Sequence, residues 1–258
     1  MRTAKRTREG KGVNLERVIA VRNDKTVYRD GGVCVKVFHE NYSKADILSE
    51  ALNGARIEET DLPIPRILGV NMAEGKWAIL SEFIEGKTLS RLMAEQPERR
   101  EEYLRLFVSL QIRVHETSCP LLTRLSDKLR RGIAEADLVA TERYKLQVRL
   151  EELAKGSRVC HGDFWPSNII LREDGSPCIL DWSRATQGDP AADAANTYLL
   201  FRMNSGDEDA ERYLSLFCEM SGTAPEDVLR WVPVVAAGRS SGIHERGKDF
   251  LLSSAKEK

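Results

Sequence analysis

The sequence of 258 residues has few cysteines, and it spaces them widely. No C-x-x-C pair occurs and the total is odd, which excludes a disulfide scaffold and a zinc site of the usual spacing. Three of the cysteines lie inside apolar runs, where they act as small core residues. A reducing cytoplasm is therefore the compartment that we expect. The cysteines are Cys34, Cys119, Cys160, Cys178 and Cys218.

Long apolar runs and an excess of one charge are also missing. A mean hydropathy of -0.39 argues against a transmembrane segment, and we expect no membrane partner. With 39 basic and 40 acidic residues, the net charge of -1 gives no field that favours nucleic acid or acidic lipid. The basic N-terminus lacks the apolar stretch of a secretory signal, so residues 1–12 are expected to form a flexible tail. No pattern predicts an oligomeric state.

One block of sequence carries a chemical signature. His161-Gly162-Asp163 is followed five positions later by Asn168, and the apolar run Ile179-Leu180 ends in Asp181. A carboxylate base beside an amide and a second carboxylate that share divalent cations is typical of phosphoryl transfer from a nucleotide. The first part alone should arise by chance in roughly one chain of this size in a thousand. Turn capping is the plain alternative for Asp163 and Asn168, but it leaves Asp181 unexplained.

The first third of the chain reads as β-rich. An alternating stretch, Val33 to Phe38, follows the tight turn Gly31-Gly32, which predicts a hairpin. A helix is expected from Tyr42 to Glu59. Two further strands are expected near residues 66–70 and 77–81, joined by a turn at Glu74-Gly75.

After Gly86 the pattern becomes mostly helical. Helices are predicted from Pro97, over about residues 121–136 and over about residues 139–154. Two short strands, at residues 169–171 and 178–180, flank the polar turn after the motif. Asp189-Pro190 is typical of a helix start. Three helices are expected from there to about residue 252, separated at Ser205-Gly206 and Ser221-Gly222.

The motif block, together with Asp181-Trp182, resembles the aminoglycoside phosphotransferase and choline kinase group of the protein-kinase-like fold. The order of predicted elements extends the resemblance from about Val18 to about Phe250. It implies an α+β fold of two lobes: a small antiparallel β-rich lobe over residues 1–83, which binds nucleotide, and a larger helical lobe over residues 84–258, which carries the catalytic loop and the acceptor site.

The resemblance also implies roles in the helical lobe. Asp163 would be the base that orients the acceptor hydroxyl, and Asn168 and Asp181 would hold Mg²⁺ on the phosphates of ATP or GTP. His161 would buttress the catalytic loop, and Asp193 would bond to it; both roles are structural.

In the β-rich lobe, Lys36 resembles the lysine that contacts the α- and β-phosphates of the nucleotide. A lysine in an apolar strand is costly unless it is paired, and Glu50 on the following helix is the expected partner. A lysine on the solvated face of an edge strand is the alternative. The backbone from Glu82 to Ile84 resembles the hinge that meets the purine edge.

Two departures from protein kinases stand out. No G-x-G-x-x-G loop is present at the turn of residues 21–26, where backbone amides of Asp24 to Thr26 and the Lys25 ammonium are expected to cover the phosphates. No activation segment ending in Ala-Pro-Glu fits between Asp181 and Pro190. The expected acceptor is therefore a small molecule rather than a folded protein.

The acceptor itself stays open at this point. The acids of residues 207–211 favour a polycationic aminoglycoside, although acids at a helix start have a simpler explanation. An aromatic wall for a sugar or a quaternary ammonium, and a basic site for an anion, are further possibilities. Kinases of choline, sugars or amino alcohols, and a catalytically silent nucleotide-binding module, are the alternative functions. The candidate residues are Trp182, Tyr198 and Trp231 for the wall, and Arg184, Arg202 and Arg239 for the basic site.

Overall fold

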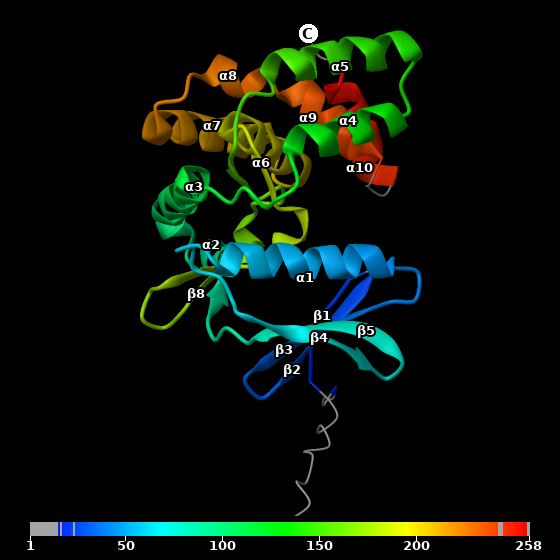
Figure 1. Cartoon of the computed structure of the whole chain (residues 1–258). Coiled ribbons are helices and arrows are strands. Elements are labelled where there is room, and N and C mark those ends of the chain that lie inside the picture. The colour runs from blue at the N-terminus through cyan, green and yellow to red at the C-terminus, as the bar shows by residue number, and fades with distance from the viewer. Residues whose placement is uncertain (1–14, 16, 23, 242–244, 257–258) are drawn as a thin grey trace, which may run out of the picture. The chain divides into compact units, whose positions relative to one another are not determined.

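The structure, a computed structural model, describes residues 15, 17–22, 24–241 and 245–256. The tail expected over residues 1–12 lies outside these residues. Packing divides the chain into two units, Met1–Leu52 with Pro65–Ile84, and Asn53–Ile64 with Glu85–Lys258, and each is described by itself (Figure 1).

The first unit is built on a five-stranded antiparallel sheet in the order β1-β2-β3-β5-β4. The hairpin predicted at Gly31-Gly32 joins β2 to β3, and the turn predicted at Glu74-Gly75 joins β4 to β5. Helix α1 lies along this sheet (Figure 1). The bounds are β1 Arg17–Val21, β2 Lys25–Asp30, β3 Val33–Phe38, α1 Lys44–Glu58, β4 Ile67–Ala73 and β5 Lys76–Glu82.

The alternation of side chains along β3 determines which residues lie on each face of the sheet. Val35 and Val37 point to one face, where they form a buried cluster with Ala78. Phe38 points to the other face and packs with Ile47 of α1. Lys36 has the parity of Phe38, so the same alternation places it on the face that α1 covers.

The second unit is mostly helical and holds two small sheets. Strand β7 pairs with β10, and β8 lies between β6 and β9. The helices are α2 Leu89–Glu95, α3 Arg100–Glu116, α4 Leu125–Glu135, α5 Ala140–Leu153, α6 Pro190–Asn204, α7 Asp207–Ser221, α8 Pro225–Leu229, α9 Val232–Ser240 and α10 Glu245–Ser254. The strands are β6 Lys87–Thr88, β7 Arg158–Cys160, β8 Ile169–Leu171, β9 Pro177–Ile179 and β10 Thr186–Gly188, and short 3₁₀ turns cover Pro97–Arg99, Pro166–Asn168 and Trp182–Arg184.

A cluster of aromatic rings fills the centre of this unit. Phe107 of α3 lies 4.7 Å from Phe164 and 5.8 Å from Phe201 between ring centroids. Tyr213 of α7 stacks on Phe201 at 5.2 Å. Phe164 directly follows Asp163 and is fully buried, so the packing of the core fixes the backbone of the catalytic loop.

Helices α4 and α9 cross at a pair of glycines. A Cβ atom on Gly132 would lie only 2.0 Å from the carbonyl oxygen of Gly238, so neither helix can carry a side chain there without moving apart. The close approach brings Lys128, one turn before Gly132, and Arg239, directly after Gly238, to the same cavity.

Most predicted elements agree with the structure to within a few residues. The N-cap predicted at Asp189 is present: its carboxylate accepts a hydrogen bond from the Ala191 N–H at 2.9 Å. The single helix expected after Gly222 was wrong, because that stretch forms three short helices, α8, α9 and α10. Among the residues described, no helix is both long enough and apolar enough to span a bilayer.

Candidate active site

The catalytic loop begins where β7 ends and makes a tight turn at Gly162. Gly162 has a φ of +77°, and a Cβ atom there would lie 2.6 Å from the carbonyl oxygen of Arg184. Both facts require glycine, because a side chain would be strained and would displace the chain after Asp181. The turn therefore packs the loop of Asp163 directly against the segment that carries Arg184.

His161 connects the two strands around the loop. Its ring is fully buried, and Nε2 lies 3.0 Å from the carbonyl oxygen of Leu180. Since that oxygen only accepts, Nε2 carries the proton and donates it. Nδ1 then accepts from the backbone N–H of Asp163 at 3.2 Å. His161 thus holds the backbone next to Asp163 and Asp181 together, which agrees with the buttressing role expected for it.

Asp193, in the first turn of α6, bonds to the same loop as predicted. Its carboxylate accepts from the backbone N–H groups of His161 at 3.1 Å and Gly162 at 2.8 Å, and from His115 Nε2 at 3.0 Å. Burial raises the pKa of Asp193, but the hydrogen bond and charge of His115, with the His161 ring, outweigh it and hold the pKa below 3.8. Asp193 is an ionised anchor of the loop.

The Asp163 carboxylate lies between an amide and a guanidinium. Asn168 Nδ2 donates to the Asp163 carbonyl oxygen at 2.9 Å and lies 3.3 Å from Oδ2. Arg239 Nη2 lies 3.6 Å from Oδ1. The Asp163 side chain keeps a third of its surface exposed, so a substrate hydroxyl can still reach it. These contacts fix the direction of a carboxylate that stays accessible.

Asn168 and Asp181 have the donor chemistry that Mg²⁺ requires. The Nδ2 bonds of Asn168 turn its Oδ1 away from Asp163, and this oxygen accepts no hydrogen bond from the residues described. The Leu180 N–H donates to the Asn168 carbonyl oxygen at 2.7 Å, which holds the backbone just before Asp181 against Asn168. Asp181 adopts a left-handed φ of 59°, a conformation rare outside glycine that is often kept at functional sites. A hard amide oxygen and a carboxylate fit this cation.

Lys36 and Glu50 form the ion pair that the sequence predicted. Lys36 Nζ lies 2.5 Å from Glu50 Oε1, with 19% of the lysine side chain and 7% of the glutamate side chain exposed. This pairing explains how a lysine is kept on a strand face that α1 covers. The solvated edge-strand alternative is thereby excluded, since β3 is also a central strand of the sheet.

The segment expected to form a hinge follows β5. The Glu82 N–H donates to Arg66 and the Phe83 N–H donates to Gly32, both at 2.9 Å. Both amides are therefore used within the sheet. The Ile84 N–H makes no hydrogen bond with the residues described, and the Ile84 side chain is buried.

A family model described as a phosphotransferase enzyme family matches residues 17–230, most of the chain. The chain belongs to this phosphotransferase family. An aminoglycoside 3'-phosphotransferase from Niallia circulans is 26% identical over 189 residues, which are 66% of this chain and 70% of that protein. The resemblance drawn from the motif block is confirmed.

Solved structures share the fold of this phosphotransferase. APH(3'')-Id from Streptomyces rimosus, in complex with ADP and streptomycin, has a TM-score of 0.60 and 22% identity over 83% of this chain and 90% of that one. Choline kinase LicA from Streptococcus pneumoniae has a TM-score of 0.62 and 15% identity over 93% of both chains. The predicted α+β protein-kinase-like fold is confirmed, and the chain is a small-molecule kinase that phosphorylates an alcohol group.

The acidic residues considered for a cationic acceptor are engaged by other side chains of the phosphotransferase. Asp207 pairs with Arg202 at 2.9 Å, and Asp209 pairs with Arg100 at 2.6 Å. Glu211 accepts a hydrogen bond from the Tyr198 hydroxyl at 2.6 Å. These pairs account for three of the four candidate acids, all except Glu208, without a ligand.

The aromatic residues considered for a wall are buried. Trp182 lies tilted against His161, with 4.6 Å between centroids, and donates from Nε1 to the Ile179 carbonyl oxygen at 3.0 Å. Tyr198 and Trp231 are also buried. Trp182 and Tyr198 therefore serve the core, whereas Trp231 also borders a pocket.

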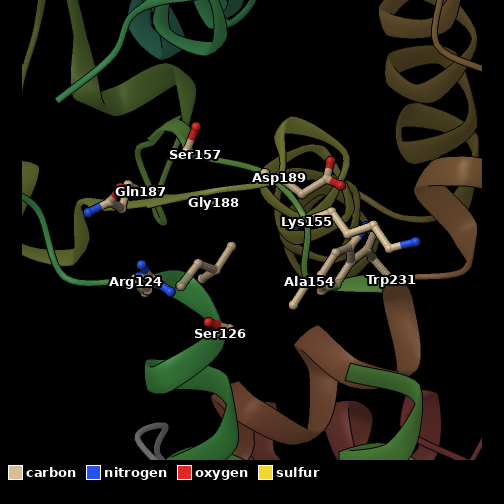
Figure 2. A pocket seen from close by; sticks show the side chains of 11 residues that line it. Arg124, Ser126, Ala154, Lys155, Ser157, Gln187, Gly188, Asp189 and Trp231 are labelled. Carbon is tan, nitrogen blue, oxygen red and sulfur yellow. The ribbon is translucent and has the colours of Figure 1, made fainter. Parts of the chain in front are cut away.

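That pocket lies away from the residues expected to act in catalysis. It has a volume of about 230 Å³, and Figure 2 shows Arg124 and Gln187 on one side of it and Lys155 beside Trp231 on the other. None of Asp163, Asn168 and Asp181 lines it. Lys155 gives this pocket one exposed positive charge.

The basic residues near Asp163 have only weak signals in the sequence. Arg184 and Arg239 were considered for an anion, and both line a small cavity beside Gly162. Arg202 was considered with them, but it pairs with Asp207 and does not line this cavity. Lys128 was not singled out, because nothing in the local pattern of α4 distinguishes it from other lysines on a solvated helix face.

Proposed function

We propose that the enzyme transfers the γ-phosphate of ATP or GTP to a hydroxyl of a small acceptor, with Asp163 as the base. The observation that carries the proposal is the accessible Asp163 carboxylate, held by Asn168 and Arg239 on a loop that the core fixes. Alignment of the acceptor hydroxyl is the main contribution of such a carboxylate.

The reaction has one bond-making and one bond-breaking event. The acceptor oxygen attacks the γ-phosphorus, the bond from that phosphorus to the bridging oxygen breaks, and the nucleoside diphosphate leaves. The hydroxyl proton passes to the Asp163 carboxylate and later to solvent. Asn168 and Asp181 would hold Mg²⁺, which neutralises charge on the phosphate oxygens when bound.

The nucleotide side of the proposal rests on the β-rich lobe, residues 1–83. Lys36, oriented by Glu50, would bind the α- and β-phosphates, as the family resemblance implies. At the hinge, the Glu82 N–H is already used, so the Ile84 N–H would donate to the purine ring, and nearby carbonyl groups would accept from it. The relatives solved with ADP support a nucleotide as donor.

The acceptor is proposed to be small because the chain has no long segment after Asp181. A 3₁₀ turn, Trp182–Arg184, and the short strand β10 take up the distance to α6.

The cytoplasm is the compartment proposed for the enzyme. All the cysteines are free thiols, as expected in a reducing compartment.

The proposal is tested by phosphate release and transfer with ATP or GTP and Mg²⁺ over a panel of aminoglycosides, choline, sugars and amino alcohols. Asp163→Asn and Asp181→Asn should each lose about a thousandfold or more in turnover while keeping the wild-type melting temperature. Asp174→Asn, at an exposed turn, is the matched control and should be as active as wild type. Equal turnover in all three variants would refute the assignment, and nucleotide binding without turnover in the wild type would favour a silent module.

A further inference from the structure

A cavity beside the catalytic loop gathers cationic side chains from three separate elements. It has a volume of about 60 Å³, and Lys128 of α4, Arg184 of the turn after Asp181 and Arg239 of α9 all line it. Gly162 forms part of its wall, which places the cavity one residue away from Asp163. We call this space the basic cavity.

Arg184 has no partner among the residues described that balances its charge. Its guanidinium forms no hydrogen bond or ion pair with the residues described, although the side chain is only partly exposed. Lys128 donates to the backbone oxygen of Arg184 at 3.1 Å, which leaves its charge uncompensated. Arg239, by contrast, has an ion-pair partner among the residues described, the Asp163 carboxylate at 3.6 Å.

A buried donor also lines the cavity without a partner. Asn196 is 4% exposed, and its Oδ1 accepts from Arg239. The Nδ2 of the same amide makes no hydrogen bond with the residues described. Because an unsatisfied buried donor is costly, this atom indicates an acceptor group supplied by a ligand or by water.

Among the residues described, the three cations of the basic cavity outnumber the two carboxylates near it, Asp163 and Asp193. Asp193 also lines it, but its carboxylate already accepts from His115 and from two backbone N–H groups. Burial and the neighbouring arginines lower the pKa of Lys128 to about 8, and burial and Arg184 lower the pKa of Arg239 to about 10. Like charges kept so close are stabilised by an anion between them.

We propose that the basic cavity binds an anionic group, a carboxylate or a phosphate, of the acceptor. This inference rests on the proposed function and names the chemical class of its substrate. Arg184, Lys128 and the Asn196 amide bind the anionic group, so that a hydroxyl elsewhere on the same molecule reaches Asp163. A polycationic acceptor is repelled by the same charges.

The position of the basic cavity favours the acceptor over the nucleotide as the source of the anion. Neither Asn168 nor Asp181, the residues proposed to hold the cation on the phosphates, lines it. Its volume of about 60 Å³ is small, which suits one charged group with the rest of the molecule outside.

Four small probes separate these charge classes: glycerol, glycerate, glycerol 3-phosphate and ethanolamine. Each is titrated, with NMR detection, into the full chain saturated with AMP-PNP and Mg²⁺, so that the nucleotide phosphate positions are already filled. We expect the two anions to bind at least tenfold more tightly than glycerol, and ethanolamine to bind most weakly. Comparison of glycerate with glycerol 3-phosphate then distinguishes a carboxylate site from a phosphate site.

Arg184→Gln is the decisive variant, because this guanidinium makes no contact that the fold needs. It should weaken binding of the preferred anion about ten- to a hundredfold and leave the affinity for AMP-PNP unchanged. Lys155→Gln removes the same charge from the pocket of Figure 2 and should change neither affinity.

Three results would overturn the inference. They are equal binding of glycerol and the anions, preference for ethanolamine, and a loss of AMP-PNP affinity in Arg184→Gln in place of a loss of anion affinity. The readout is binding alone, so it is independent of turnover. If the wild type binds the anions but Asp163→Asn does not reduce turnover, the proposed function fails while the basic cavity stands.

Discussion

The Arg239 guanidinium faces the Asp163 carboxylate, with 3.6 Å between Nη2 and Oδ1. The same guanidinium donates from Nη1 to the Gly162 carbonyl oxygen at 3.0 Å and to the Asn196 amide oxygen. A single side chain from α9 therefore holds the backbone before Asp163 and carries a positive charge beside its carboxylate.

Arg239→Lys should separate these two contributions. The lysine keeps a positive charge but cannot bond the Gly162 oxygen, Asn196 and Asp163 with one planar group. We expect kcat to fall about tenfold or more, with a smaller change in the KM for nucleotide. Steady-state kinetics check this. An unchanged kcat would show that catalysis does not depend on the planar guanidinium of Arg239 and needs its positive charge at most.

Glu50→Gln tests the nucleotide side. The variant removes the carboxylate that lies 2.5 Å from Lys36 Nζ, so the lysine loses its orienting partner. We expect the KM for ATP to rise about tenfold while acceptor binding stays as in the wild type. Glu58→Gln, near the end of the same helix, is the control. If the KM for ATP in Glu50→Gln equals that of the wild type, the Lys36–Glu50 ion pair is not needed for nucleotide binding.

Gly162→Ala should damage both the fold and the activity. Alanine at a φ of +77° costs about 1–3 kcal/mol, and its Cβ would also overlap the Arg184 backbone. Gly175→Ala is the matched control, since Gly175 has a φ of +79° with no atom within 4 Å of an added Cβ. Denaturant unfolding and turnover are measured for both. We expect only Gly162→Ala to lose most of its activity.

Lys128 predicts a pH dependence of anion binding. Its pKa of about 8 reflects burial and the charges of Arg184, Arg239 and Arg131, which Asp163 opposes only in part. The ammonium is therefore charged below pH 8 and neutral above it, so the affinity for an anionic acceptor should fall as pH rises through about 8. Lys128→Arg keeps its charge and should flatten this profile between pH 7 and 9; an identical profile in both proteins would contradict the assignment.

Asp193→Asn should destabilise the chain by about 3 kcal/mol, because the buried carboxylate anchors His115 and two backbone N–H groups. The pKa of Asp193 in the folded protein lies below its ordinary value of 3.8. The stabilisation that the ionised carboxylate provides is therefore fully present well above pH 3.8 and is lost as the pH falls through the folded pKa. Urea unfolding at pH 7 and pH 3 should therefore show a smaller difference from wild type at pH 3. Asp189→Asn, which keeps an N-cap, should match wild type.

The parts of the site that lie close together in the sequence could be predicted from it. The spacing from Asp163 to Asn168 and the alternation that places Lys36 on one face are local properties, and the structure keeps both. Arg184 and Arg239 were candidates for a basic site from the sequence, but their place in one cavity with Lys128 could not be predicted, because the three come from distant segments that tertiary packing brings together. The short helices α8 and α9 were missed for the same reason: tertiary contacts, rather than periodicity, decide where such short elements end.

The glycine contact between α4 and α9 also bears on how the enzyme could be given a new acceptor. Gly132 and Gly238 bring two backbones together without any side chain in between. The positions from which Lys128 and Arg239 project are thus set by main-chain atoms, while their charges are set by side chains alone. Arg239 must stay, because it also bonds the Gly162 oxygen and Asn196. A designer can exchange the charge of Lys128 for a neutral or acidic group and keep this helix contact, so acceptor preference can be altered at Lys128 separately from the packing of α4 on α9.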